Sequence, residues 1–416
     1  MIFGSGLRRA LVVLALAILI WFGWPLYGFL SNQFEVARLP FGWHDLRSDA
    51  PTDEELFDLQ YVDASAAALS ILTERRKEIL APSLSAAVAI DGKLIWAGAV
   101  GWQDVAENLP ITTNTAYRIG STSKPVGITG LARLATEGRI ELDRPIETYV
   151  QDLPNPDWNV FTPRQLASHT AGLSAYEENT DWIGFYQSLA LTTRFEDPMA
   201  ALAVFDDADT LFEPGTDFHY SGFDNVLLSA VVQNVAGVAF DTFMSSEIFD
   251  PLGMASTRPD HRRTPSTEFA LSYQSKGTRV KQWRSVDLSH KLAAGGYVST
   301  PKDLARLGAA WLDDAFISPD VRQTFWTPVK LTNGEDNEQN YALGFRRNTW
   351  PVDGVGDVVH LNHGGVSKGA QCWLMIVPDH GIALAISTNR RTDSFFDFAD
   401  VYVDLLEVFI AARKDS

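Results

Sequence analysis

The stretch that decides the fold of this chain is YRIGSTSKPVGITGLARLATEGRI, residues 117–140. It begins as a strand-like run and continues with apolar residues at helical spacing, which end at Gly138. Ser121 and Lys124 lie three residues apart where the strand gives way to the helix. The pair is either a nucleophile with its base or a polar helix start with a solvated lysine. The spacing alone does not choose between these readings.

The same S-x-x-K pattern occurs a second time, at Ser299 to Lys302. Here the local residues predict an ordinary helix start. Thr300 is a typical N-cap, Pro301 suits the first helical position, and Asp303 supplies an acidic third position. A structural role for the second copy means that any catalytic role for Ser121 must be argued from its surroundings.

Composition describes a large globular protein and excludes two classes of partner. The chain has 416 residues, 46% of them hydrophobic and 21% charged, with a net charge of −18. A phosphate-binding surface needs clustered Lys and Arg, so we expect no nucleic acid partner. Cys372 is the only cysteine, which we interpret as a small core residue. Without a Cys cluster or an H-x-x-x-H pair, we expect no metal and no cofactor.

The N-terminus carries a candidate membrane anchor. Arg8 and Arg9 precede 21 apolar residues, Ala10 to Leu30, which as a helix would span about 31 Å. Three aromatic residues suit the far interface: Trp21, Trp24 and Tyr27. The arginines predict a single-pass protein with its N-terminus in the cytoplasm and the rest outside, in the periplasm if the source is bacterial. A cleaved signal peptide is the alternative, but the apolar part is long and lacks a small-x-small cleavage site.

Strand-like segments occur early and late in the chain, with helices and loops between them. Such an order predicts an α+β fold, in which both ends of the chain build an antiparallel sheet and a mostly helical lobe is inserted. The expected elements are a helix over 62–80, a hairpin turning at Asp91-Gly92, a hairpin of buried strands over 370–388 and a last helix over 394–413. We divide the chain into an anchor with a juxtamembrane segment (1–40), a lead-in linker and helix (41–82), and a main domain (83–416).

Residues 174–210 have no clean period and carry Trp182, Phe185 and Tyr186 among many carboxylates. The segment is either a lid or substrate-facing insertion, or a peripheral helical excursion.

Several other segments fall in a characteristic order along the chain. They are TPRQLASHTAGL (162–173), FEPGTDFHYSG (212–222), DPLGM (250–254), LAAGGYVSTPKDLARLG (292–308) and LNHGGVSKGAQCW (361–373). Together with RIGSTSK, they resemble the serine β-lactamase and penicillin-binding-protein-like superfamily over roughly residues 83–410. The resemblance is to its class C, D-alanyl-D-alanine carboxypeptidase and esterase branch. It implies a β-lactamase/transpeptidase-like fold and places the second S-x-x-K at a family helix start.

The resemblance also implies roles for individual residues. Ser121 would be the nucleophile at a helix N-terminus, where free N–H groups favour developing negative charge. Lys124, one turn on, would take its proton. Tyr220 would be the second acid/base, its alternative being a half-buried strand aromatic. The backbone N–H groups of Ser121 and Val366 would form the oxyanion hole.

Residues beside the oxyanion hole allow more than one reading. His363, Gly364 and Gly365 would form the substrate-binding edge, where glycines let a ligand approach the backbone. For His363, a place in the pocket wall without a catalytic role stays open. His169 fits a structural role, since the residues around it form a helix end.

Two motifs depart from the family pattern. The usual Y-x-N is Tyr220-Ser221-Gly222, which lacks the amide that binds the acyl group of β-lactams and peptides. The usual K-T-G is His363-Gly364-Gly365, whose neutral imidazole holds an anion poorly, although Lys368 could supply the charge.

Both departures argue against an efficient β-lactamase, and Gly222 also argues against a D-alanyl carboxypeptidase. The sequence thus predicts a membrane-anchored serine hydrolase that forms an acyl-enzyme with a small-molecule, peptide or ester substrate, with esterase, peptidase or weak β-lactamase-like activity. The alternative is a non-catalytic sensor or scaffold that binds a partner.

Overall fold

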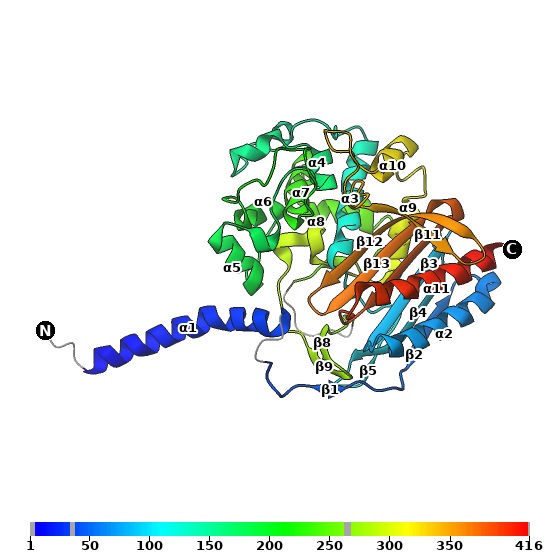
Figure 1. Ribbon diagram of the computed structural model, residues 1–416, viewed down its shortest axis with the longest axis horizontal. Helices are drawn as coiled ribbons and strands as arrows, with labels where there is room; N and C mark the ends of the chain where they lie inside the picture. Colours follow the sequence, from blue (N-terminus) through cyan, green and yellow to red (C-terminus); the bar gives the residue numbers. More distant parts are fainter. Residues whose placement is uncertain (1–4, 34–37, 262–267, 415–416) are drawn as a thin grey trace.

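Both ends of the chain build the central antiparallel sheet, as expected. The computed structural model describes residues 5–33, 38–261 and 268–414 (Figure 1). Its sheet has the strand order β11-β12-β13-β14-β3-β4-β2, with β5 beside β4. The early strands are β2 (Thr52–Leu56), β3 (Ser83–Ile90), β4 (Lys93–Asp104) and β5 (Leu109–Pro110). The late strands are β11 (Arg346–Val352), β12 (Gly356–Ser367), β13 (Ala370–Val377) and β14 (Ile382–Thr388).

Tight turns set the register of the sheet. Asp91 and Gly92 both have positive φ, 48° and 81°, which is the type I′ geometry that matches the twist of a hairpin. Strands β3 and β4 pair on either side of this turn, and β13 pairs with β14 after a second turn at Pro378–His380. Both predicted hairpins are confirmed.

Helices cover both faces of the sheet. Helices α2 (Val62–Glu78) and α11 (Phe395–Lys414) lie together on one face, where their apolar side chains share a core with the strands. Helix α9 (Pro301–Ala310) lies on the other face, where small side chains of helix and sheet allow close packing: Ala87, Ala89, Ala97, Ala305, Ala309 and Ala383. The predicted first and last helices are confirmed within two residues at each end.

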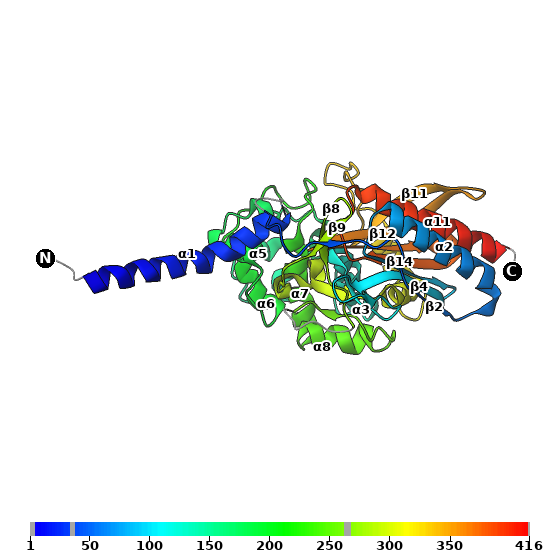
Figure 2. The ribbon, with the colours of Figure 1, turned by 90° about the horizontal axis from the view of Figure 1, so that it is seen from below.

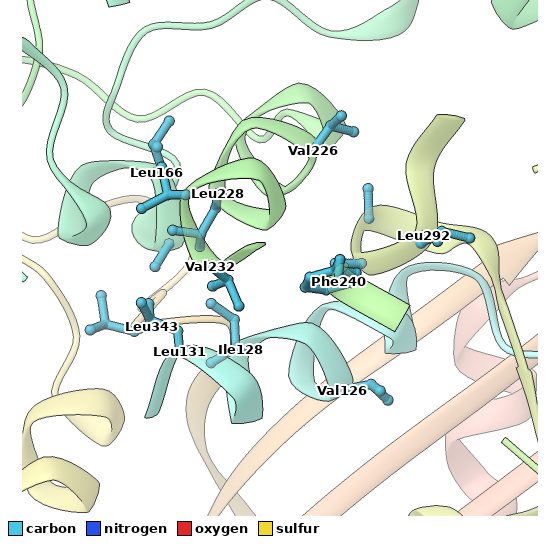
Figure 3. Close-up of a cluster of buried hydrophobic side chains, with 14 of the residues drawn as sticks. Val126, Ile128, Leu131, Leu166, Val226, Leu228, Val232, Phe240, Leu292 and Leu343 are labelled. Carbon is cyan, nitrogen blue, oxygen red and sulfur yellow. The ribbon is translucent and has the colours of Figure 1, made fainter. Parts of the chain in front are cut away.

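The inserted lobe is mostly helical and packs around α3 (Ser123–Thr136). Its other helices are α4 (Pro163–Ser168), α5 (Trp182–Ala190), α6 (Pro198–Ala201), α7 (Gly222–Ala236), α8 (Phe240–Met244) and α10 (Pro319–Trp326). Figure 3 shows Ile128 and Leu131 of α3 facing Leu228 and Val232 of α7. Each fully buried aliphatic side chain contributes roughly 1.5–3 kcal/mol, so this cluster holds α3 firmly.

Short pairings join the lobe to the sheet. One small sheet has the order β6-β10-β7, from β6 (Tyr117–Arg118), β10 (Tyr297–Ser299) and β7 (Arg258–Pro259). Another has the order β1-β9-β8, from β1 (His44–Asp45), β9 (Arg279–Gln282) and β8 (Tyr273–Lys276). Strand β6 leads directly into the turn that carries Ser121.

The segments before and within the lobe have definite structure. The lead-in 41–82 supplies strand β2, which pairs with β4, and helix α2, so it is part of the layered body. Residues 174–210 form α5, α6 and short 3₁₀ turns at one edge of the lobe.

Helix α1 (Ser5–Gln33) extends away from the body in both views (Figures 1 and 2). Its Gly6–Asn32 part contains an 18-residue window with a mean hydropathy of 2.2 and is long and apolar enough to cross a membrane.

Candidate active site

Ser121 lies in a single 3₁₀ turn, η2 (Gly120–Thr122), that runs directly into α3. The turn is fixed to the sheet, because the Thr122 hydroxyl donates a hydrogen bond of 3.2 Å to the carbonyl of His363 in β12. The Ser121 side chain is half-buried and lines a cavity of about 580 Å³. The serine therefore stands at the junction of the helical lobe and the sheet, open to a ligand.

Lys124 faces Ser121 from the first turn of α3. Its Nζ lies 3.5 Å from the Ser121 Oγ and donates a 3.0 Å hydrogen bond to the carbonyl of Ala294. The lysine is 1% exposed, and within the described ranges no carboxylate forms an ion pair with it. Its amine is thus held beside the serine by a neutral carbonyl, which leaves it available for proton exchange.

The second S-x-x-K copy has the structural role predicted for it. Thr300 caps α9 by accepting a hydrogen bond from the Asp303 N–H. The Ser299 hydroxyl lies 2.7 Å from that of Thr257, whereas the Lys302 Nζ donates to Glu55 at 2.6 Å. This lysine is neutralised by an acid, unlike Lys124.

Tyr220 lies in the extended segment before α7, with its ring against both cations of the site. The Lys124 Nζ is 4.5 Å from the ring centre and the Arg346 guanidinium is 5.3 Å from it. Burial alone would raise the pKa of Tyr220. The positive charges of Lys124 and Arg346, with hydrogen bonding to Lys124 and Ser121, outweigh burial and bring the pKa below its usual 10.0.

His363 lies behind Tyr220 and has no exposed surface. Its Nδ1 lies 2.8 Å from the carbonyl of Gly364, so that nitrogen carries the proton, and its Nε2 accepts from the Tyr341 hydroxyl at 3.0 Å. The Tyr220 hydroxyl is 3.4 Å from the same Nε2. Burial, with the charges of Arg346 and Lys124, holds the pKa of His363 well below its usual value. The expected substrate contact of His363 is therefore replaced by a neutral support for Tyr220.

A second buried histidine supports the other side of Tyr220. The rings of His169 and Tyr220 have centres 4.5 Å apart, and the His169 Nδ1 lies 2.7 Å from the Asp224 carboxyl. Burial lowers the pKa of His169 and raises that of Asp224, because both charged forms lose their contact with water. His169 has φ of 61° at the C-terminus of α4, which agrees with the predicted helix end.

The register of the β12–β13 hairpin places Val366, the expected second oxyanion donor. Lys368 and Gly369 form its two-residue turn, so ladder hydrogen bonds join Ser367 to Ala370 and skip the next pair, Val366 with Gln371. The Val366 N–H consequently points away from β13. Its nitrogen lies close to η2, since a Cβ atom on Gly120 would be 2.8 Å from it. The structure thus brings the Val366 nitrogen close to the turn that carries Ser121.

Glycine at 365 permits this approach. A Cβ atom there would stand 2.8 Å from the Ser121 nitrogen and 2.6 Å from the Thr122 nitrogen, closer than real Cβ contacts come. Gly364, next to it, lines the cavity and leaves room for the Phe395 ring.

The cavity beyond Ser121 has an aromatic wall and one cation. Its aromatic residues, apart from Tyr220, are Trp350, Trp373, Phe395, Phe396 and Tyr402. Arg346, at the start of β11, lines it too and donates to the Gln339 side chain and, at 3.4 Å, to the His363 Nε2. Across the described part of the chain, no carboxylate pairs with Arg346. The cation expected from Lys368 is instead Arg346, because Lys368 lies in the hairpin turn with its amine 5.6 Å from the Phe29 ring centre of α1.

A tyrosine occupies the space over Gly222. A Cβ atom on Gly222 would collide with the hydroxyl of Tyr176, and that hydroxyl is buried with no hydrogen-bond partner within the described residues. Tyr176 therefore stands where the family's usual asparagine side chain would begin.

Sequence reasoning missed Arg346, Tyr341 and Tyr176. None lies within a recognised motif, and each reaches the site through packing between separate elements, as with Tyr341 and His363, which are 22 positions apart. The cluster SFFDF at the start of α11 was a signal for the aromatic wall, since it is rich in aromatic residues at a helix start. Cys372 is a buried core residue, as expected, and burial raises the pKa of its thiol to about 12.

Comparison with known proteins agrees with this arrangement. The chain is 26% identical to the human mitochondrial serine beta-lactamase-like protein LACTB, over 74% of this chain and 71% of that one. It is 24% identical to penicillin-binding protein 4* of Bacillus subtilis, over 74% and 68%. The D-amino acid amidase of Ochrobactrum anthropi has the same fold, with a TM-score of 0.69 at 22% identity over 84% and 99%.

The family model described as Beta-lactamase matches residues 70–408, a range that holds every catalytic candidate and the whole sheet except β2. Because that match covers most of the chain, the protein belongs to the beta-lactamase family.

Proposed function

We propose that this protein is a serine hydrolase that cleaves an ester or amide through an acyl-enzyme on Ser121. One observation carries the proposal: the Lys124 amine lies against both the Ser121 hydroxyl and the Tyr220 ring, and no carboxylate among the described residues forms an ion pair with it. A purely structural lysine needs no such arrangement, as Lys302 beside Glu55 illustrates.

The site geometry supports a two-step reaction. The Ser121 Oγ attacks the substrate carbonyl, and its proton passes to the Lys124–Tyr220 pair. The N–H groups of Ser121 and Val366 stabilise the negative carbonyl oxygen of the tetrahedral intermediate. The pair then returns the proton to the leaving alcohol or amine as the bond to it breaks. A water molecule, deprotonated by the same pair, releases the acyl group as an acid and regenerates Ser121.

The cavity suggests the chemical class of the substrate. Its aromatic wall favours an apolar or aromatic group, and the guanidinium of Arg346 favours a carboxylate or another anion beside it. Gly222 supplies no amide for the substrate's acyl amide, so esters and simple amides are favoured over β-lactams. Hydrolysis of p-nitrophenyl esters, simple amides and a β-lactam, compared side by side, tests this order of preference.

We propose further that α1 anchors the protein in a membrane. Its apolar stretch follows Arg8 and Arg9, which favours a cytoplasmic N-terminus and a catalytic body outside the cytoplasm.

A fluorophosphonate probe tests the proposed nucleophile. We expect covalent labelling of the full-length protein and its loss in Ser121→Ala. Ser299→Ala is the matched control, because it removes the serine of the other S-x-x-K copy, and it should label like the wild type. If neither fluorophosphonate nor any activated ester in a p-nitrophenyl panel modifies Ser121, the hydrolase proposal is wrong and the non-catalytic alternative is favoured.

A further inference from the structure

The N-terminal part of α1 is free and its C-terminal part packs against the body. The point where packing begins places the body relative to a bilayer. Residues 6–24 are exposed throughout, whereas most of residues 25–32 are wholly or partly covered by the body. Figures 1 and 2 both show the N-terminal part of the helix standing clear of the rest. The inference drawn here rests on the proposed role of α1 as a membrane anchor.

The free part of α1 is too short to cross the hydrocarbon layer alone. A hydrocarbon core of about 30 Å needs about 20 helical residues, which from Ala10 reach Phe29. The exposed apolar stretch from Ala10 to Trp24 supplies only about 22 Å at ~1.5 Å per residue. The last several ångströms of the hydrocarbon layer therefore coincide with the level at which α1 packs against the body.

Helix α5 is the element of the body that lies at this level. The Tyr186 hydroxyl donates a 3.1 Å hydrogen bond to the carbonyl of Phe22, and the two rings have centres 5.8 Å apart. At the C-terminal end of α5, Arg284 donates to the carbonyls of Leu189 and Ala190 while its side chain packs against Gly28. The middle and the C-terminal end of α5 are thus attached to the outer part of α1, and its N-terminal end is left free of these contacts.

The exposed face of α5 is apolar. Trp182 is 81% exposed and Ile183 is 73% exposed, and the helix sequence WIGFYQSLA contains no charged residue. Asp181 caps the helix by accepting hydrogen bonds from the Ile183 and Gly184 N–H groups, so its carboxylate belongs at the level of the polar headgroups. A short helix with an aromatic and aliphatic face and a polar cap suits the boundary between headgroups and acyl chains.

We propose that α5 is a second membrane-binding element, which lies in the outer interface of the bilayer beside α1 with Trp182 and Ile183 in contact with the acyl chains. The partner is the lipid surface itself, and the contact continues the one that α1 makes. This assigns a role to the 174–210 segment as a membrane-facing insertion.

The same attachment brings the catalytic cavity close to the bilayer surface. Lys368 holds its amine 5.6 Å from the Phe29 ring centre, and Phe29 is the residue at which the hydrocarbon layer would end. Lys368 lies two residues after Val366, which lines the cavity and is 38% exposed. The rim of the cavity therefore faces the headgroups, and amphiphilic substrates would reach it from the lipid surface.

Depth-dependent fluorescence quenching tests the proposal on the full-length chain in vesicles of phosphatidylcholine and phosphatidylglycerol. An NBD fluorophore is attached to a single introduced cysteine at one of three exposed positions. The native Cys372 is fully buried, and the unmodified chain serves to check that it takes no label. Ile183→Cys reports on α5, and Leu19→Cys reports on the anchor. Leu59→Cys, at an apolar position that is 80% exposed shortly before α2, is the control. Figure 1 shows α2 at the end of the body away from the free part of α1.

Phosphatidylcholines with a doxyl group at acyl carbon 5 or 12 act as quenchers. We expect the label at 183 to be quenched several-fold more by the shallow than by the deep quencher, the label at 19 to be quenched by the deep one, and the label at 59 by neither. If the label at position 19 is quenched and the label at 183 is as unquenched as the label at 59, the proposal for α5 is overturned and the anchor proposal stands. If the label at position 19 is not quenched, both the anchor proposal and this one are wrong. Fluorophosphonate labelling of Ser121 in the same samples reports on the hydrolase proposal independently.

Discussion

Gly365 lies directly against the backbone of Ser121, so that a Cβ atom on Gly365 would be 2.8 Å from the Ser121 nitrogen. This contact joins β12 to the start of α3 and brings together the backbone segments that carry the two proposed oxyanion donors, Ser121 and Val366. Neither donor depends on a side chain, which means that the oxyanion hole can be tested by removing a single N–H group.

Val366→Pro removes one of these donors. Because the Val366 N–H points away from β13, the change costs no ladder hydrogen bond, and we expect kcat to fall by about 100- to 1000-fold, the usual effect of losing one such donor. Steady-state hydrolysis of a p-nitrophenyl ester measures it. Val366→Ala keeps the N–H and should stay within a few-fold of the wild type. Equal losses in the two variants would show that the side chain, and not the N–H, matters.

The ionisation of Tyr220 predicts a pH dependence. Its pKa lies below 10.0, because the charges of Lys124 and Arg346 outweigh the effect of burial. A basic Tyr220 is the active form, so kcat/KM for a neutral ester should rise with pH through this pKa, with the midpoint of the rise below pH 10. Arg346→Gln removes one positive charge, which should move the rise to higher pH, and Tyr220→Phe should abolish it. A rise at the same pH in Arg346→Gln would contradict this account of the site.

Arg346 also predicts a preference for anionic substrates. Hydrogen bonds to charged groups contribute about 1.5–3 kcal/mol, so Arg346→Gln should raise KM for a carboxylate-bearing ester by roughly 10- to 100-fold. The matched uncharged ester should change little when both are assayed at the pH of full activity. Equal changes in KM for the two esters would remove Arg346 from substrate binding.

The contact between Gly222 and Tyr176 predicts coupled effects on stability. A methyl group at 222 would collide with the Tyr176 hydroxyl, and overpacking of this kind costs about 1–3 kcal/mol. Gly222→Ala should therefore lower the urea midpoint. The same change in a Tyr176→Ala background should cost much less, since the double variant frees the space. Additive effects would show that the two residues do not touch.

Membrane contact by α5 predicts a dependence on how the substrate is presented. Trp182→Ser with Ile183→Ser changes no residue of the catalytic site. We expect several-fold slower hydrolysis of a long-chain p-nitrophenyl ester held in vesicles and an unchanged rate on a short-chain ester in solution. Slower hydrolysis of both esters would point to a defect in the fold, which a urea titration of the double variant would detect.

Local chemistry accounts for the parts of this protein that its sequence predicted. The Asp91-Gly92 turn, the cap at Thr300 and the apolar stretch of α1 depend on residues close together in the chain. The order of motifs predicted the family and its fold. For the site, the placing of Ser121 beside Lys124 needed only one helical turn, since residues three apart share a face.

Long-range packing decided the rest of the site. Arg346 rather than Lys368 supplies the cation of the cavity, and His363 became a buried support because Tyr341 and Tyr220 cover it. These outcomes depend on how β11, β12 and the helical lobe meet, and on a two-residue turn that directs the Val366 N–H away from β13. A sequence pattern reports close neighbours along the chain, whereas the charge and burial in this site depend on residues from 17 to 143 positions away from His363.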